Sequence, residues 1–160
     1  MSTVVSSGNQ LLESLLAERI LILDGAMGTQ VQTLNLDEAQ ARGERFAGHT
    51  KDLVRFVDLL CLTHPDKITE IHHRFLAAGA DIIETNSFGS STVAKEEFGL
   101  SADLVREINF AAVQCARRAV DEFNERTPHK PRFVAGSIGP TTKPMAISTS
   151  AYDPAHRAVS

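Results

Sequence analysis

The sequence predicts an α/β fold built on a parallel sheet, because three short apolar runs alternate with helical patterns along its 160 residues. The apolar runs are Ile20 to Leu23, Ala80 to Ile83 and Phe133 to Ala135. Each of them ends in glycine or polar residues. Because the carboxyl ends of parallel strands carry the functional site, we expect one polar cluster at a common mouth.

The first unit begins after a small, polar stretch, residues 1–9, which predicts a flexible tail. A short amphipathic helix capped by Asn9 is then predicted by helical spacing of Leu11, Leu12, Leu15 and Leu16. The run Ile20 to Leu23 is continuously apolar, which predicts a strand buried on both faces. It ends at Asp24 and Gly25.

The second unit is a helix followed by a strand. Thr63 is a candidate N-cap with Pro65 in the first turn, and the helix is expected to end at Gly79. Its apolar stripe consists of Ile68, Ile71, Phe75 and Leu76. In the third unit Ser101 is a candidate N-cap for a long helix, which the segment ERTPHKP ends before the last strand.

The connection between Gly25 and Ala80 is longer than one helix needs, and we expect Arg42 to Phe46 to form a loop over the mouth. Three parallel strands would leave an unpaired edge and a bare apolar face. The sequence therefore predicts a truncated domain.

The composition excludes several classes of function. The net charge is −4 and no Lys or Arg cluster occurs, which argues against nucleic-acid binding. No signal peptide or membrane-spanning run is present, and two cysteines do not make a disulfide framework. A cytoplasmic protein without membrane contact is the expectation.

Two strand-end segments are candidates for ligand binding. DGAMGT (24–29) combines a carboxylate with two glycines, and ETNSF (84–88) places a carboxylate, a hydroxyl and an amide in succession. The second set suits a zwitterionic small molecule. A tight turn in the first segment and loop capping in the second are the structural alternatives.

Metal and thiol chemistry have weaker support. His72 and His73 are adjacent on a helix and point in different directions, and no HExxH or Cys-x-x-Cys spacing occurs. Cys61 and Cys115 are most simply core residues.

Several segments together resemble the homocysteine S-methyltransferase family: LDGAMGTQVQ, RGERFA, a Leu-rich stretch before Pro65, FLAAGADIIETNSF and VAGSIGPT. The resemblance covers about residues 10–155. Within the family, RGERF with INFAAVQCARRA and HKPR is most similar to the N-terminal homocysteine-binding module of cobalamin-dependent methionine synthases.

The resemblance implies a (β/α)8 TIM barrel, of which residues 10–160 would be the N-terminal part, about three β/α units. It implies zinc held by three cysteines, which binds the homocysteine thiolate, and a methyl group passed to that sulfur from methylcobalamin to give methionine. Folate and cobalamin modules of a full-length enzyme are the implied partners. The positions that match the substrate's ammonium and carboxylate site are Asp24, the main chain of Gly25, Glu84, Thr85 and Asn86.

The sequence departs from the family at the metal. The family's cysteines lie in Gly-Gly-Cys-Cys and Asn-Cys contexts, and neither occurs here. Cys61 and Cys115 are therefore not assigned as ligands, and the metal and catalytic residues are expected beyond Ser160. Neither zinc nor cobalamin is expected to bind this chain alone, which we expect to be inactive.

Two alternatives stay open. The chain could belong to a cobalamin-independent homocysteine S-methyltransferase with another methyl donor, or it could be a non-catalytic half-barrel that associates with itself or a partner.

Overall fold

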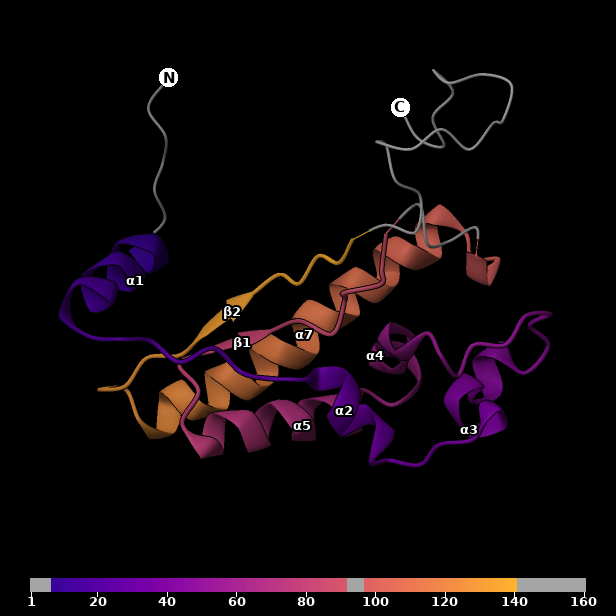
Figure 1. The fold of residues 1–160 in the computed structure, drawn as a ribbon, viewed down its shortest axis with the longest axis horizontal. Helices are drawn as coiled ribbons and strands as arrows, with labels where there is room; N and C mark the ends of the chain where they lie inside the picture. Colours follow the sequence, from indigo (N-terminus) through magenta and orange to yellow (C-terminus); the bar gives the residue numbers. More distant parts are fainter. Residues whose placement is uncertain (1–6, 92–96, 141–160) are drawn as a thin grey trace, which may run out of the picture.

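A computed structural model describes residues 7–91 and 97–140 of the chain (Figure 1). In the labels of Figure 1, α marks an α-helix and β a strand, and we use η for a short 3-10 helix. The elements are α1 (Ser7–Glu18), α2 (Met27–Gln32), α3 (Glu38–Arg42), η1 (Glu44–Phe46), η2 (Val57–Leu59), α4 (Leu60–Thr63), α5 (Pro65–Ala78), β1 (Ile82–Glu84), α7 (Ala102–Arg126) and β2 (Phe133–Ala135).

The predicted strands lie side by side and parallel. β1 pairs with β2, with Ile83 opposite Val134. On the other edge of β1, Leu23 forms a parallel bridge with Ile82, and the main-chain N–H of Asp24 donates to the carbonyl of Ile82 at 2.9 Å. Successive apolar runs are therefore neighbours in space, which brings all their carboxyl ends to one side of the molecule.

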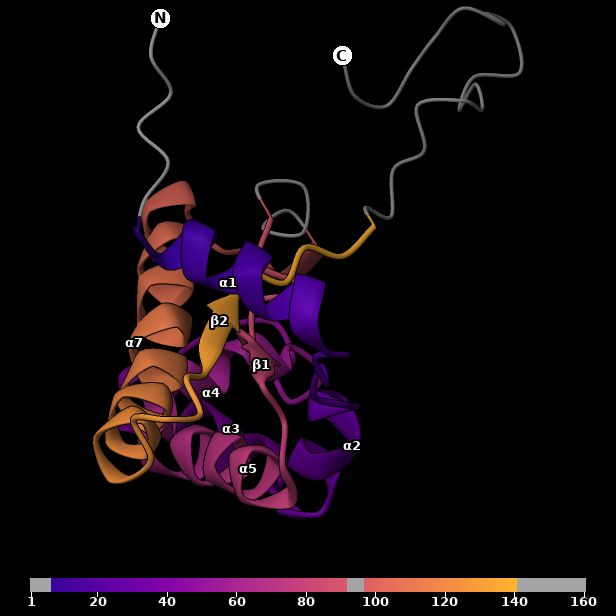
Figure 2. The same cartoon turned by 90° about the vertical axis from the view of Figure 1, so that its left-hand side faces the viewer.

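The long helices α5 and α7 pack against each other and against the strands. Both views show α1 on the opposite side of the strands from α5 (Figures 1 and 2). The predicted helix ends are confirmed at two positions. Gly79 ends α5 with a left-handed φ of 112°, and the Ser101 hydroxyl accepts the N–H of Leu104 at 3.1 Å at the start of α7. Among the described residues, no helix has the length and apolar character needed to span a bilayer.

The core lies between α5, α7 and the strands. One of its clusters joins Ile83 of β1 to Leu76 of α5 and Val120 of α7, all of them fully buried. The stripe predicted on α5 and the apolar face predicted on α7 are thus confirmed. Burying side chains of this size contributes about 1.5–3 kcal/mol each relative to exposure, so this layer fixes the positions of the strand ends.

The run Ile20 to Leu23 differs from its prediction. Among the described residues, pairing is found at its edge facing β1 alone, and Ile20 is 86% exposed, with Ile22 and Leu23 also exposed. Burial on both faces is therefore wrong for this segment. The apolar run predicted which segment pairs with β1, whereas burial depends on what packs over the segment, which its own sequence does not contain.

Two predicted helix caps are also wrong. α1 begins at Ser7, so Asn9 lies inside its first turn, and residues 7–9 are helical rather than part of a tail; residues 1–6 lie outside the described residues. Thr63 ends α4, and its hydroxyl donates to the carbonyl of Ala41 at 2.9 Å, while α5 begins at Pro65. Leucine spacing identifies a helical face but does not fix the residue at which a helix begins.

The segment Arg42 to Phe46 packs against the helices and does not cover the mouth, so this expectation is wrong. Arg42 donates to the carboxylate of Glu38 and to the carbonyl of His49 at 2.6 Å. Arg45 forms a double hydrogen bond, both 2.7 Å, with Glu107 of α7, and Phe46 is buried. These cations have carboxylate partners, which fix the segment away from the strand ends.

A buried carboxylate fixes the start of β1. Asp81 is 1% exposed and accepts hydrogen bonds from the Arg19 guanidinium at 2.8 and 2.9 Å and from the main-chain N–H of Ile22 at 3.0 Å. The hydrogen bond from Arg19 is the main reason that the pKa of Asp81 falls to about 2. This contact joins the end of α1 and the first strand to β1.

We expect Asp81→Ala to lower the free energy of unfolding by about 1–3 kcal/mol, since it removes hydrogen bonds made to a charged group. Because the folded pKa lies below the ordinary value of 3.8, this stabilisation is present above pH ~4 and lost as the pH falls toward 2. Urea unfolding followed by circular dichroism measures both effects. The matched control is Asp121→Ala, which breaks the exposed pair with Arg117 and should change stability by less than about 0.5 kcal/mol; equal losses would contradict the assignment.

Candidate functional site

Polar residues from the carboxyl ends of the strands line one pocket of about 420 Å³. The lining residues are Asp24, Gly25, Ala26, Met27, Gly28, Val57, Asp58, Glu84, Thr85, Asn86, Phe88 and Ser137. All five residues predicted as substrate-binding are among them. We refer to this cavity as the mouth pocket.

Asp24 lies where the first apolar run ends. Both of its carboxylate oxygens lie 3.1 Å from the main-chain nitrogen of Glu84, whose N–H donates to them. Burial raises the pKa of Asp24 to about 6, against the lowering effect of that N–H, and the charge of Glu84 raises it further. The carboxylate is thus largely ionised at neutral pH in a setting that favours a neighbouring cation.

The described ionisable side chains that line the mouth pocket are all acidic. Among the described residues, its titratable side chains are the carboxyl groups of Asp24, Asp58 and Glu84, and no described Lys, Arg or His lines it. Within the described residues the Glu84 carboxylate has no hydrogen-bond or ion-pair partner. The pocket therefore attracts a positively charged group, such as the ammonium of an amino acid.

Thr85 joins the ends of β1 and β2. Its hydroxyl lies 2.7 Å from the Ser87 hydroxyl and accepts the N–H of Ser137 at 3.0 Å, while Ser87 donates to the carbonyl of Ser137 at 3.0 Å. Because the Ser87 hydroxyl donates its proton to the carbonyl of Ser137, the Thr85 hydroxyl is the donor in its hydrogen bond with Ser87. Thr85 thus holds the wall of the pocket and has no free proton for a ligand.

Asn86 also has structural hydrogen bonds. Its side-chain amide donates to the carbonyl of Val57 at 3.0 Å and contacts the Cys61 sulfur at 3.6 Å, and the side chain is buried. Asp24, Glu84 and the exposed main chain of Gly25 therefore offer the groups available to a ligand, while Thr85 and Asn86 position them.

The segments after β1 and β2 approach each other closely at Gly139. The N–H of Gly139 donates to the carbonyl of Phe88 at 2.9 Å. A Cβ atom at position 139 would stand 2.5 Å from that carbonyl oxygen, which no real side chain allows. Gly139 is thus needed to bring the two strand ends together at the pocket.

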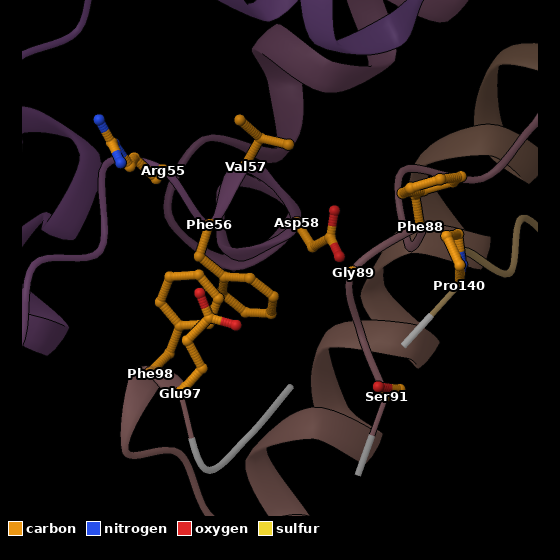
Figure 3. A pocket seen from close by; sticks show the side chains of 10 residues that line it. All are labelled: Arg55, Phe56, Val57, Asp58, Phe88, Gly89, Ser91, Glu97, Phe98 and Pro140. Carbon is orange, nitrogen blue, oxygen red and sulfur yellow. The ribbon is translucent and has the colours of Figure 1, made fainter. Parts of the chain in front are cut away.

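Asp58 is a pocket residue that the sequence analysis missed. It is 2% exposed, accepts the Ser90 hydroxyl at 3.1 Å, and also accepts main-chain N–H groups of Gly89 and Ser90. Figure 3 shows a neighbouring pocket that Asp58 also lines, in which its carboxylate lies beside Gly89. Burial raises the pKa of Asp58 to about 6. The available signal was an acidic residue inside the apolar run VDLL, since a buried acid needs partners.

The described residues do not fit a zinc ion. Among them, no three His, Cys, Asp or Glu side chains form a group that could hold a metal ion. Cys61 and Cys115 are both buried, on α4 and α7, and do not line the mouth pocket. His72 is buried and His73 contacts Glu122 at 3.2 Å, so the neighbouring rings diverge as predicted. No metal-dependent step is assigned to these residues.

Most of the chain is similar to known homocysteine methyltransferases. The model of the homocysteine S-methyltransferase family matches residues 21–160. The homocysteine methyltransferase MmuM from Escherichia coli is similar in its metallated form, with 24% identity and a TM-score of 0.63 over 81% of this chain and 41% of that chain. Its oxidized form has 26% identity and a TM-score of 0.63 over 81% and 40%. The chain thus spans about two fifths of these solved structures.

Proposed function

Because this chain belongs to the homocysteine S-methyltransferase family, we propose that its mouth pocket binds the amino-acid end of homocysteine. The observation that supports this most is the pair of carboxylates, Asp24 and Glu84, in a pocket that no cationic side chain of residues 7–91 or 97–140 lines. The ammonium of the substrate would lie between these carboxylates, and the main-chain N–H of Gly25 would be available to the substrate carboxylate. Thr85 and Asn86 would hold the walls.

The parallel order of the three strands, with helices between them, is what the first three units of a (β/α)8 barrel would have. We propose that the chain forms this part of the barrel. In that arrangement the mouth pocket lies at the carboxyl ends of the strands, where barrel enzymes bind their substrates.

We further propose that the parent activity is that of a cobalamin-dependent methionine synthase, which methylates homocysteine to methionine and carries folate and cobalamin modules. The segments RGERF, INFAAVQCARRA and HKPR favour this reading. Zinc in such an enzyme would bind the homocysteine sulfur and lower the pKa of its thiol, so that the substrate reacts as a thiolate. The described residues are assigned only the binding and orientation of the amino-acid end. A cobalamin-independent methyltransferase remains the alternative, and the segment that follows Ser160 in the gene distinguishes the two.

Ligand analogues test the proposed binding site. Homocysteine should bind more tightly than 4-mercaptobutanoate, which lacks the ammonium, by roughly 10- to 150-fold, the worth of a charge-assisted hydrogen bond of about 1.5–3 kcal/mol. Isothermal titration of reduced protein with each compound measures the ratio. Equal affinities would show that the carboxylates of the pocket do not recognise the ammonium.

We expect homocysteine affinity to depend on pH through Asp24. The substrate ammonium stays protonated between pH 5 and 8, whereas Asp24 has a pKa of about 6. Binding should therefore be strongest above pH ~7 and fall by about tenfold at pH 5, as the carboxylate is protonated. Titrations at pH 5, 6 and 7.5 measure this dependence, with Asp24→Asn as the control that should lose it. Affinity that is constant over this range in the unsubstituted chain would contradict the role of Asp24.

Exposed apolar residues favour a second function, association with another chain. Ile20 and Ile138 are 86% and 90% exposed, and Ile22 and Leu23 are exposed at the edge of the strands. Unpaired edges with apolar side chains promote pairing between chains. Native mass spectrometry across a range of protein concentrations tests this: a dimer that Ile22→Lys disrupts would support association, and a monomer at every concentration would contradict it.

A further inference from the structure

The two cysteines, predicted as separate core residues, lie together in the fold. Cys61 on α4 and Cys115 on α7 belong to one buried cluster, and neither is in a disulfide. Each thiol is the largest influence on the pKa of the other. Sequence spacing gave no sign of this pairing, because it arises from the packing of α4 against α7.

Both cysteines line one cavity. It has a volume of about 160 Å³ and is lined by Cys61, Pro65, Ala111, Gln114, Cys115 and Arg118. Pro65, Gln114 and Arg118 are exposed, whereas both cysteines are buried. The two buried cysteines thus line a cavity whose other lining residues include exposed ones, which offers a small solute a route toward the thiols.

The surroundings make the two thiols chemically different. The neighbouring Cys61 thiol lowers the pKa of Cys115, and the positive charge of Arg118 lowers it further. The neighbouring Cys115 thiol, together with burial, raises the pKa of Cys61. Since a thiolate is the reactive form, Cys115 is the nucleophile that reacts first, and Cys61 is the second thiol, which attacks the oxidised Cys115.

We propose that Cys61 and Cys115 form a redox-active dithiol that closes into an intrachain disulfide when a peroxide enters the cavity beside Arg118. The Cys115 thiolate attacks a peroxide oxygen, the O–O bond breaks, and the sulfur becomes a sulfenic acid as hydroxide takes up a proton to leave as water. The Cys61 sulfur then attacks the sulfenic sulfur, and a second water leaves with the Cys61 proton. Two thiols and one hydrogen peroxide give one disulfide and two waters.

Disulfide formation would alter the mouth pocket, because Cys61 contacts Asn86, which lines that pocket. The Cys61 thiol donates to the Asn86 carbonyl at 3.5 Å, and the Asn86 amide contacts the Cys61 sulfur at 3.6 Å. Closing the disulfide removes the S–H donor and draws the sulfur toward α7. We therefore expect the backbone around Asn86 to lose protection in the oxidised protein. The chemistry of the pair is independent of the ligand that the pocket takes.

The test uses the reduced 160-residue chain treated with a small excess of hydrogen peroxide. We expect loss of both thiols that react with Ellman's reagent after denaturation, a mass decrease of two hydrogen atoms, and a cross-linked peptide containing Cys61 and Cys115 after digestion. Dithiothreitol should reverse all three. Hydrogen exchange should show faster exchange in the peptide that contains Asn86.

Single variants provide the controls. In Cys61→Ser, Cys115 should stop at the sulfenic acid, which dimedone traps. In Cys115→Ser, Cys61 should react at least tenfold more slowly. Circular dichroism before and after oxidation establishes that the chain stays folded. Two thiols retained in the folded protein after treatment, disulfides only between chains, or cross-linking only in denaturant would each overturn the proposal.

Discussion

Asp24→Asn is expected to weaken homocysteine binding by roughly 10- to 150-fold while leaving the fold intact. The substitution removes the charge that faces the substrate ammonium, and charge-assisted hydrogen bonds of this kind are worth about 1.5–3 kcal/mol. The remaining amide oxygen can still accept the N–H of Glu84, which the carboxylate accepts at 3.1 Å. Calorimetric titration of homocysteine, together with a thermal melt, measures both quantities.

Two further variants separate the charge of Asp24 from its structural hydrogen bond. Asp24→Ala removes both, so it should lower the melting temperature as well as the affinity. Asp103→Asn changes an exposed acid in the first turn of α7, away from the pocket, and should change affinity less than twofold. If Asp24→Asn folds and binds homocysteine as the unsubstituted chain does, Asp24 acts only through its hydrogen bond with the main chain of Glu84.

Asp58→Ala is expected to destabilise the protein by about 3 kcal/mol and to open the wall of the mouth pocket. The carboxylate accepts the Ser90 hydroxyl and the N–H groups of Gly89 and Ser90. Each buried donor left without an acceptor costs about 1–3 kcal/mol, of which water entering the pocket recovers part. Urea unfolding measures the loss, and hydrogen exchange of the peptide spanning residues 84–91 measures the opening.

Asp58→Asn is the matched control. It keeps one acceptor oxygen and removes a buried charge, and burial of that charge is what raises the pKa of Asp58 to about 6. We expect Asp58→Asn to retain most of the stability at pH 7 and to differ little from the unsubstituted chain at pH 5, where the native carboxyl is itself largely protonated. Destabilisation by the asparagine variant equal to that by alanine would show that the carboxyl does not act as an acceptor for the loop.

The sequence predicted the features that depend on local chemistry. Gly79 and Ser101 end and begin their helices as expected, because a left-handed turn and a side-chain oxygen cap are properties of single residues. Asp24 and Glu84 reach one pocket as expected, because parallel strands bring their carboxyl ends to the same side. These inferences needed only residue types and order along the chain.

Features that depend on packing between distant segments could not be predicted. The hydroxyl of Thr85 looked available to a ligand, but Ser137 from the next strand end takes it. Asp58 had no visible partner in the sequence because Ser90 lies on another segment. The proximity of Cys61 and Cys115 likewise arises only when α4 meets α7.

The pKa of Asp24 with and without homocysteine tests the central claim most directly. The ¹³Cγ resonance of labelled Asp24, followed from pH 3 to 9, reports the protonation of this carboxyl alone. We expect a midpoint near pH 6 in the free chain and a midpoint lower by at least about one unit at saturating homocysteine, because a bound ammonium stabilises the carboxylate. A midpoint that homocysteine leaves unchanged at saturation would contradict the proposal that the mouth pocket holds the substrate's ammonium.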